Sequence, residues 1–183
     1  MSKDNSSWIT RRRLPKKVVD LIEVESYKVP WYFYKDCALS LDIVERDNLD
    51  MNPYFSHALS RGNDKSDHYK FFPIDFISKF ALKSNMEMIR SHITFHYPIR
   101  EKFGQHHNAH VDNDNPHDVI LYYINDADGD TVFCDEHDHS NIIHRETPKR
   151  GKCVIFEGLH TYHASSSTTK NIRMTLNINY DHL

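Results

Sequence analysis

The chain has 183 residues, of which 39% are apolar and 27% charged, and its formal net charge is −3. These values suit one domain with a single core, and they give no overall positive field that would attract nucleic acid or an anionic membrane. Cys37, Cys134 and Cys153 are too few and too widely spaced for a disulfide framework, which predicts free thiols in a reducing compartment. No apolar run reaches the length of a membrane span and the start is polar, so we expect a soluble cytoplasmic protein.

The first third of the chain gives a mixed pattern. Residues 1–13 are expected to be disordered, and the apolar positions in residues 14–27 do not decide between helix and strand. After Pro30, the aromatic run Trp31–Tyr34 predicts a strand whose rings we expect in the core rather than in a substrate platform. The polar segment 45–70 predicts a mobile loop or lid.

From residue 71 onward the periodicity is clearer. Residues 71–82 place apolar side chains at helical spacing, whereas residues 86–97 alternate with a period near two and end at Pro98. Turn signals then separate a series of short segments that we predict as strands: Ala109–Asp112, Val119–Ile124, Thr131–Cys134, Asn141–His144, Cys153–Phe156, Thr161–Ala164 and Ile172–Tyr180.

This order of elements predicts a mainly β protein, a double-stranded β-helix or jelly roll with N-terminal helices packed on one side. No internal repeat or linker divides the chain, so we expect one domain over residues 1–183. Within it, residues 14–85 would form a flanking region of helices and strands, and residues 86–183 would form the jelly-roll core.

Three residues stand out as candidate metal ligands. His110 and Asp112 are two positions apart on a predicted strand, which places both side chains on one face, and His163 lies on a later predicted strand that can return beside them. Two histidines and one carboxylate on one face are the ligands of a mononuclear non-haem iron site. Arg173 follows on the last predicted strand, where its planar fork could hold the carboxylate of a keto-acid cosubstrate.

Other residues compete for these assignments. His144 and Glu146 form a second His-x-acid pair, but too few residues separate them from the next histidines for a long return across a jelly roll. His160 lies near the same strand as His163. Each is followed ten residues later by a basic residue, His160 by Lys170 and His163 by Arg173. We favour His163 because Arg173 begins a firmly predicted strand, whereas Lys170 lies in a polar loop. His160 is then a rim residue.

Five stretches together resemble the iron(II)- and 2-oxoglutarate-dependent dioxygenases, specifically the prolyl 4-hydroxylase-like branch, over residues 97–180. The stretches are His110-Val111-Asp112, Tyr122–Asn125, Gly129–Phe133, Pro148–Phe156 and His163 through Arg173. One departure is Asp130, where the family often has a second glycine. The N-terminal half carries no matching motif, so the role of residues 1–85 stays open.

The resemblance implies a set of roles. His110, Asp112 and His163 would bind Fe(II), and Arg173 would pair with the distal carboxylate of 2-oxoglutarate. Tyr123 would place its hydroxyl on that same carboxylate, Tyr97 would line the active site, and Asn177 could face the cosubstrate.

The implied reaction consumes O2 and 2-oxoglutarate, with ascorbate as a stimulant, and hydroxylates a C–H bond with release of succinate and CO2. The resemblance favours a residue in a peptide or protein, proline among them, or a free amino acid or other small molecule. We expect no membrane or nucleic-acid partner, and the oligomeric state stays open. Two alternatives are a catalytically inactive jelly-roll module that binds metal and 2-oxo acid, and a cupin-like metal enzyme without a keto acid.

Overall fold

The computed structural model describes residues 8–35, 52–82, 86–99, 105–168 and 170–181. Its helices are α1 (Lys16–Ser26), the short 3-10 helix η1 (Tyr69–Phe71) and α3 (Ile74–Leu82). The strands of the first half are β1 (Thr10–Arg13), β2 (Tyr32–Tyr34), β3 (Tyr54–Arg61), β4 (Asp64–Lys65) and β5 (Met88–His96). Those of the second half are β6 (His117–Tyr123), β7 (Thr131–Cys134), β8 (Ile142–Glu146), β9 (Lys152–Glu157), β10 (His163–Ser165) and β11 (Arg173–Asp181).

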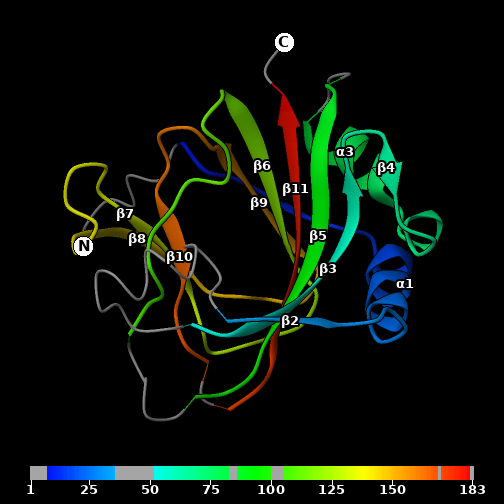
Figure 1. Ribbon diagram of the computed structural model, residues 1–183, viewed down its shortest axis with the longest axis horizontal. Coiled ribbons are helices and arrows are strands. Elements are labelled where there is room, and N and C mark those ends of the chain that lie inside the picture. Colours follow the sequence, from blue (N-terminus) through cyan, green and yellow to red (C-terminus); the bar gives the residue numbers. More distant parts are fainter. Residues whose placement is uncertain (1–7, 36–51, 83–85, 100–104, 169, 182–183) are drawn as a thin grey trace.

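Two antiparallel sheets form the body of the molecule. The larger has the order β1-β9-β6-β11-β5-β3-β2, with β4 paired to β3, and the smaller has the order β10-β7-β8. Figure 1 shows the smaller sheet on one side of the larger one, with α1 and α3 on the other side. Because sequence neighbours such as β5 and β6 are separated by β11, the chain winds between sheets as a jelly roll does. The predicted fold class is confirmed.

Strand β11 shows how the sequence divides the two faces of the larger sheet. Its alternate residues Met174, Leu176 and Ile178 are buried in the cluster that the helices cover. The residues between them, among them Thr175 and Asn177, line a pocket between the two sheets. Since successive side chains point to opposite faces, one strand supplies both the core and the site.

The helices close the outer face of the larger sheet. Val19 and Ile22 of α1 and Ile74 and Ile77 of α3 are buried in one cluster with sheet residues such as Ile178. Helix α3 confirms the amphipathic helix predicted from residue 71 onward. Residues 14–27, for which the sequence did not decide between helix and strand, contain helix α1. A second apolar cluster, formed by β6, β7 and β9 with Ile9, fills the space between the sheets.

Two expectations for the N-terminal third are wrong. Thr10–Arg13 is not disordered, because β1 pairs along β9 in register, with Thr10 opposite Ile155. The polar segment 45–70 is not a loop where it is described, because β3 pairs with β5 over most of its length. Residues 1–7 of the segment expected to be disordered and residues 45–51 of the polar segment lie outside the described residues. Strands β1, β2 and β3 therefore extend the sheet beyond the region predicted as the jelly-roll core.

The aromatic run on β2 forms the predicted strand, but its rings are not in the core. Tyr32, Phe33 and Tyr34 are 57%, 54% and 46% exposed, because β2 pairs only with β3 and lies at the end of the strand order. Of this run, only Trp31 packs against the buried cluster under the helices.

Two further expectations from composition concern cysteines and membranes. Cys134 and Cys153 are free, as predicted, and the structure buries both, whereas Cys37 lies outside the described residues. None of the helices that the structure describes combines the length and apolarity needed to cross a bilayer.

Candidate metal centre

A short backbone bridge holds the two histidines of the site together. The strand predicted over Ala109–Asp112 does not form: His110 makes only an isolated bridge to His163, with both N–H to O distances at 3.0 Å. The bridge belongs to the smaller sheet, because His163 begins β10. The two imidazoles therefore meet through antiparallel pairing, whereas the alternation along one strand that was expected to place Asp112 beside His110 does not apply.

The side chains of His110, Asp112 and His163 converge at one point. Their ligand atoms all lie within 4.8 Å of one another. Asp112 Oδ1 is 3.8 Å from His110 Nε2 and 4.0 Å from His163 Nε2, so one carboxylate oxygen faces both imidazoles. Within the described residues this is the one group of histidine, cysteine and acidic side chains with metal-binding geometry.

Both imidazoles are fixed in the form that binds a metal. His110 Nδ1 lies 3.2 Å from the carbonyl oxygen of Asn108, and His163 Nδ1 lies 3.0 Å from that of Thr161. Because a carbonyl only accepts, each Nδ1 carries the hydrogen, and the lone pair is left on Nε2. Burial lowers the pKa of His163 to about 4, which keeps this ring neutral at physiological pH.

The carboxylate of Asp112 is held on both oxygens. Its Oδ2 accepts hydrogen bonds from Asn177 Nδ2 at 2.8 Å and Asn179 Nδ2 at 2.9 Å, and its Oδ1 pairs with Arg90 Nη2 at 2.9 Å. Burial opposes ionisation, but His163, which is charged only at the low pH where this carboxyl would take up a proton, and Arg90 outweigh it and hold the pKa of Asp112 well below its usual range. The group is therefore an oriented anion with Oδ1 turned toward the histidines.

Asn177 and Asn179 both donate hydrogen bonds to the carboxylate of Asp112. Asn177 lines the pocket as predicted, but its amide donates to Asp112. Asn179 was missed at the sequence level, although it lies on the same face of β11 two residues later. Hydrogen bonds of this kind orient a ligand and tune its affinity for metal.

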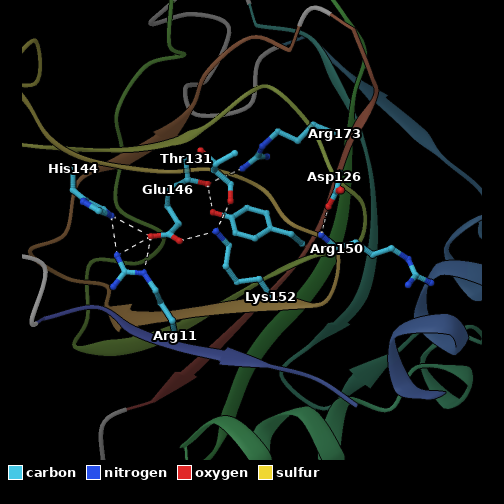
Figure 2. Close-up of polar contacts among 10 residues, drawn as sticks. Arg11, Asp126, Thr131, His144, Glu146, Arg150, Lys152 and Arg173 are labelled. Atoms are coloured by element: carbon cyan, nitrogen blue, oxygen red, sulfur yellow. Dashed lines mark hydrogen bonds and ion pairs between the residues drawn. The ribbon is translucent and has the colours of Figure 1, made fainter. Parts of the chain in front are cut away.

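Arg173 lies across the same pocket, which has a volume of about 240 Å³ and is lined by all three candidate ligands. The side chain is 3% exposed, with Nε donating to Gly129 O at 3.0 Å and Nη2 to Thr131 Oγ1 at 2.8 Å, as Figure 2 shows for Thr131. A buried guanidinium held in this way presents a preorganised cation to a carboxylate.

The segment Gly129–Thr131 positions these acceptors. A Cβ on Gly129 would lie 2.5 Å from Ser166 O and 3.0 Å from Thr168 N, so only glycine permits this close approach of two backbones. Thr131 follows, and its hydroxyl joins Arg173 to Tyr123, whose hydroxyl is 2.7 Å away. The Gly-Asp-Thr motif thus matters for backbone packing and for the arginine.

The two predicted tyrosines lie outside the pocket lining. Tyr123 is fully buried behind Thr131, and Thr131 is the residue that reaches the pocket. Tyr97 lies past the end of β5 and packs on Phe55 and Phe95, ring to ring at 5.7 and 6.0 Å. The prediction that Tyr97 lines the site is not met, because alternation along β5 sends Phe95 and Tyr97 away from the pocket.

His96 faces the pocket instead of Tyr97. It is 8% exposed, lies opposite Arg173 in the strand register and stacks on Tyr54 with ring centroids 5.6 Å apart. Its Nδ1 has no hydrogen-bond partner among the described residues. Alternation along β5 could have predicted this placement, because His92, Thr94 and His96 are two residues apart and all line the pocket.

The rejected histidines lie elsewhere. The side chain of His160 is 67% exposed and contacts Glu136, which agrees with the choice of His163. His144 and Glu146 are part of a separate ionic cluster with Arg11 and Lys152, shown in Figure 2.

No protein-family model and no curated protein matches the sequence. Solved structures do match. A 2OG-Fe(II) oxygenase family oxidoreductase from Burkholderia pseudomallei superposes with a TM-score of 0.64 at 13% identity, covering 95% of this chain and 85% of its own. A Trichoplax adhaerens prolyl hydroxylase in complex with a hypoxia inducible factor peptide fragment gives 0.62 at 12% identity, covering 97% and 84%. A Pseudomonas putida prolyl-4-hydroxylase gives 0.61 at 13% identity, covering 98% and 96%.

The chain therefore has the fold of the 2OG-Fe(II) oxygenases, prolyl hydroxylases among them. The resemblance predicted from the sequence is confirmed at the level of the fold. The donor set also fits iron: two neutral imidazoles and one carboxylate suit Fe(II) in the two-histidine, one-carboxylate arrangement.

Proposed function

We propose that this protein is an Fe(II)- and 2-oxoglutarate-dependent oxygenase that hydroxylates a C–H bond of an amino-acid or peptidyl residue. One observation carries the proposal. Two imidazole Nε2 atoms and one carboxylate oxygen converge in the same pocket as a buried arginine. A metal enzyme that used no acidic cosubstrate would have no need for that arginine.

The three ligands would hold iron on one face and leave the opposite positions open. When bound, iron with 2-oxoglutarate and O2 supplies the oxidation, in which one oxygen atom enters succinate and the other the substrate. Asp112 contributes the negative charge of the site and stays ionised, because Arg90 and the two asparagines stabilise its anion. His110 and His163 would each offer Nε2 to the ion, because each Nδ1–H is engaged with a backbone carbonyl.

Arg173 would orient the cosubstrate. Its guanidinium is held by Gly129 O and Thr131 Oγ1, so it does not need to reorganise when an acid end group arrives. Thr131 reaches the pocket and Tyr123 supports it from behind. His96, whose buried Nδ1 has no hydrogen-bond partner among the residues that the structure describes, adds a second polar group beside the arginine.

The residue class of the substrate rests on the fold. A prolyl hydroxylase of this fold was solved with a peptide fragment, which favours a peptide or amino acid over other small molecules, with proline as one candidate residue. Succinate production is the test. The protein would be incubated aerobically with Fe(II), 2-oxoglutarate, ascorbate and a pool of peptides and amino acids.

The controls are matched. His163→Ala should abolish iron-dependent succinate formation, whereas His160→Ala, three residues earlier and exposed, should retain it. Retained activity in the His163 variant would reject the ligand assignment. Absence of iron-dependent succinate in the unaltered protein would leave the inactive binding module as the better description.

A further inference from the structure

A second hollow adjoins the metal pocket. It has a volume of about 130 Å³ and lies on strands β2, β3 and β5. Tyr54, Arg90 and His92 line both hollows, so the two lie side by side and share these side chains. We call this second hollow the β3 groove. It is defined by its walls, Tyr34, Tyr54, Arg61 and Arg90, and by its floor.

The floor of the β3 groove is made of small side chains. Ser56, Ala58 and Ser60 come from β3 and Ser91 from β5. The hydroxyls are already satisfied within the sheet: Ser60 Oγ lies 2.7 Å from Ser91 Oγ, and Ser56 Oγ donates to Ile93 O. Because these side chains are small and their hydroxyls already have hydrogen-bond partners, the floor leaves room for an extended chain.

One wall of the β3 groove is aromatic. The rings of Tyr34 and Tyr54 are 5.2 Å apart at 31°, and Tyr34 is 46% exposed. Tyr54 also stacks on His96 at 5.6 Å, which carries the aromatic surface from the β3 groove into the metal pocket. Aromatic faces of this kind bind apolar and flat groups at a small cost in conformational entropy.

The other wall is cationic. Arg90 is neutralised by Asp112, with 2.9 Å between Nη2 and Oδ1. Arg61 is exposed and makes no ion pair with another residue that the structure describes. Among the described residues that line the β3 groove, none carries a carboxylate. Asp64 lies opposite Arg61 in the register of β4 against β3 without forming an ion pair with it, so the described lining of the β3 groove itself offers the exposed guanidinium no carboxylate.

We infer that the β3 groove binds the substrate of the proposed oxygenase, and that this substrate is an amino-acid or peptide chain carrying a carboxylate that pairs with Arg61. The chain then lies over the small floor, against the tyrosine wall, and directs its neighbouring residue toward His110 and Asp112. This inference rests on the proposed function and adds the charge class of the substrate to it.

Binding of matched peptides tests the inference without turnover. The probes are capped tripeptides with glutamate in the middle, each paired with a twin that has glutamine there. Ligand-observed NMR would measure their binding to the full-length protein, first without added metal and then with Zn(II) and 2-oxoglutarate. We expect at least one acid to bind about fivefold more tightly than its amide twin, with a preference that weakens at high salt.

Variants locate the preference. Arg61→Gln should remove it, Arg61→Lys should retain most of it, and Arg145→Gln, at an exposed arginine on β8, should leave it unchanged. Equal or absent binding of every acid and amide pair, or a preference that survives Arg61→Gln, would overturn the inference. If the protein forms succinate but shows no preference for acidic peptides, only the proposal of an acidic substrate fails. If it prefers acidic peptides but forms no succinate with iron, the proposed oxygenase activity fails.

Discussion

Two His-x-acid pairs of this chain have the same spacing and different surroundings. In the first, Asp112 Oδ1 faces His110 Nε2 and His163 Nε2 at 3.8 and 4.0 Å inside a pocket. In the second, His144 Nε2 bonds Glu146 Oε2 directly at 3.1 Å. The first pair is a candidate metal site, and the second is an ionic cluster.

The two carboxylates also differ in the number of cations that they meet. Arg11 Nη2 pairs with Glu146 Oε2 at 2.9 Å and Lys152 Nζ pairs with Oε1 at 2.7 Å, so both oxygens face a full positive charge (Figure 2). Asp112 meets one arginine, and its other oxygen is held by neutral amides. Spacing makes a histidine and a carboxylate available in both pairs, but among the described residues only the first pair is joined by a second imidazole, that of His163.

The largest expected effect distinguishes the two histidines. His110→Ala should weaken Mn(II) binding by at least about 100-fold, because one of three protein ligands is lost. His144→Ala should leave it within about twofold of the unaltered protein. Titration of Mn(II), followed by the electron paramagnetic resonance signal of the free ion, measures both. Equal losses in the two variants would remove the distinction.

A smaller loss is expected at the opposite end of the pocket. Arg173→Ala should weaken 2-oxoglutarate binding by roughly 10- to 100-fold, because charge-assisted hydrogen bonds contribute about 1.5–3 kcal/mol. Calorimetric titration with Zn(II) in place of iron measures this. Lys152→Ala is the comparison, since it removes a cation of the ionic cluster and should leave the affinity nearly unchanged. Unchanged cosubstrate affinity in the Arg173 variant would count against its role as anchor.

Loss of one hydrogen bond to the Asp112 carboxylate should have a smaller effect on ligand binding than either of these changes. Asn179→Ala removes one of the two amides on Asp112 Oδ2 and should reduce Mn(II) affinity by about tenfold. The fold should persist because the amide of Asn177 still holds the carboxylate. Circular dichroism of the variant can check this. An Asn179 variant that binds Mn(II) as tightly as the unaltered protein would show that the carboxylate is oriented by other contacts.

The ionic cluster should affect stability and not metal binding. Burial opposes ionisation of Glu146, but Arg11, Lys152 and His144 lower its pKa to about 2 from an ordinary 4.5. Its stabilising effect is therefore complete above about pH 4.5 and is lost as the pH falls toward 2. Glu146→Gln should cost about 2 kcal/mol of unfolding free energy at pH 7.

Urea unfolding at several pH values tests this last prediction. The difference between Glu146→Gln and the unaltered protein should shrink between pH 4.5 and pH 2, while Mn(II) affinity at pH 7 stays the same. A constant difference across that range would mean that the charge of Glu146 is not what stabilises the fold.

Local patterns predicted much of this molecule. The period of two on β11 predicted a strand whose Arg173 and Asn177 share a face, and the helical spacing from residue 71 predicted α3. These features depend on residues that are close in the sequence, so the periodicity of apolar residues is enough to predict them. The metal group was predicted by order and spacing, although a backbone bridge rather than a strand holds His110.

The features that escaped prediction depend on distant pairing. Arg11 contacts Glu146 across 135 positions, and β1 forms only because the edge of β9 is open to it. Which of His96 and Tyr97 faces the pocket depends on the exact register of β5 against β11, and a shift of one residue exchanges them. Arg90 reaches Asp112 from another strand, so its spacing in sequence carries no signal.

A crystal structure of the protein soaked with Mn(II) and 2-oxoglutarate under nitrogen tests the central claim most directly. The account predicts one strong anomalous peak between Nε2 of His110, Nε2 of His163 and Oδ1 of Asp112, with the keto acid extending from it to Arg173. A peak at His144 and Glu146, or 2-oxoglutarate bound away from Arg173, would contradict it.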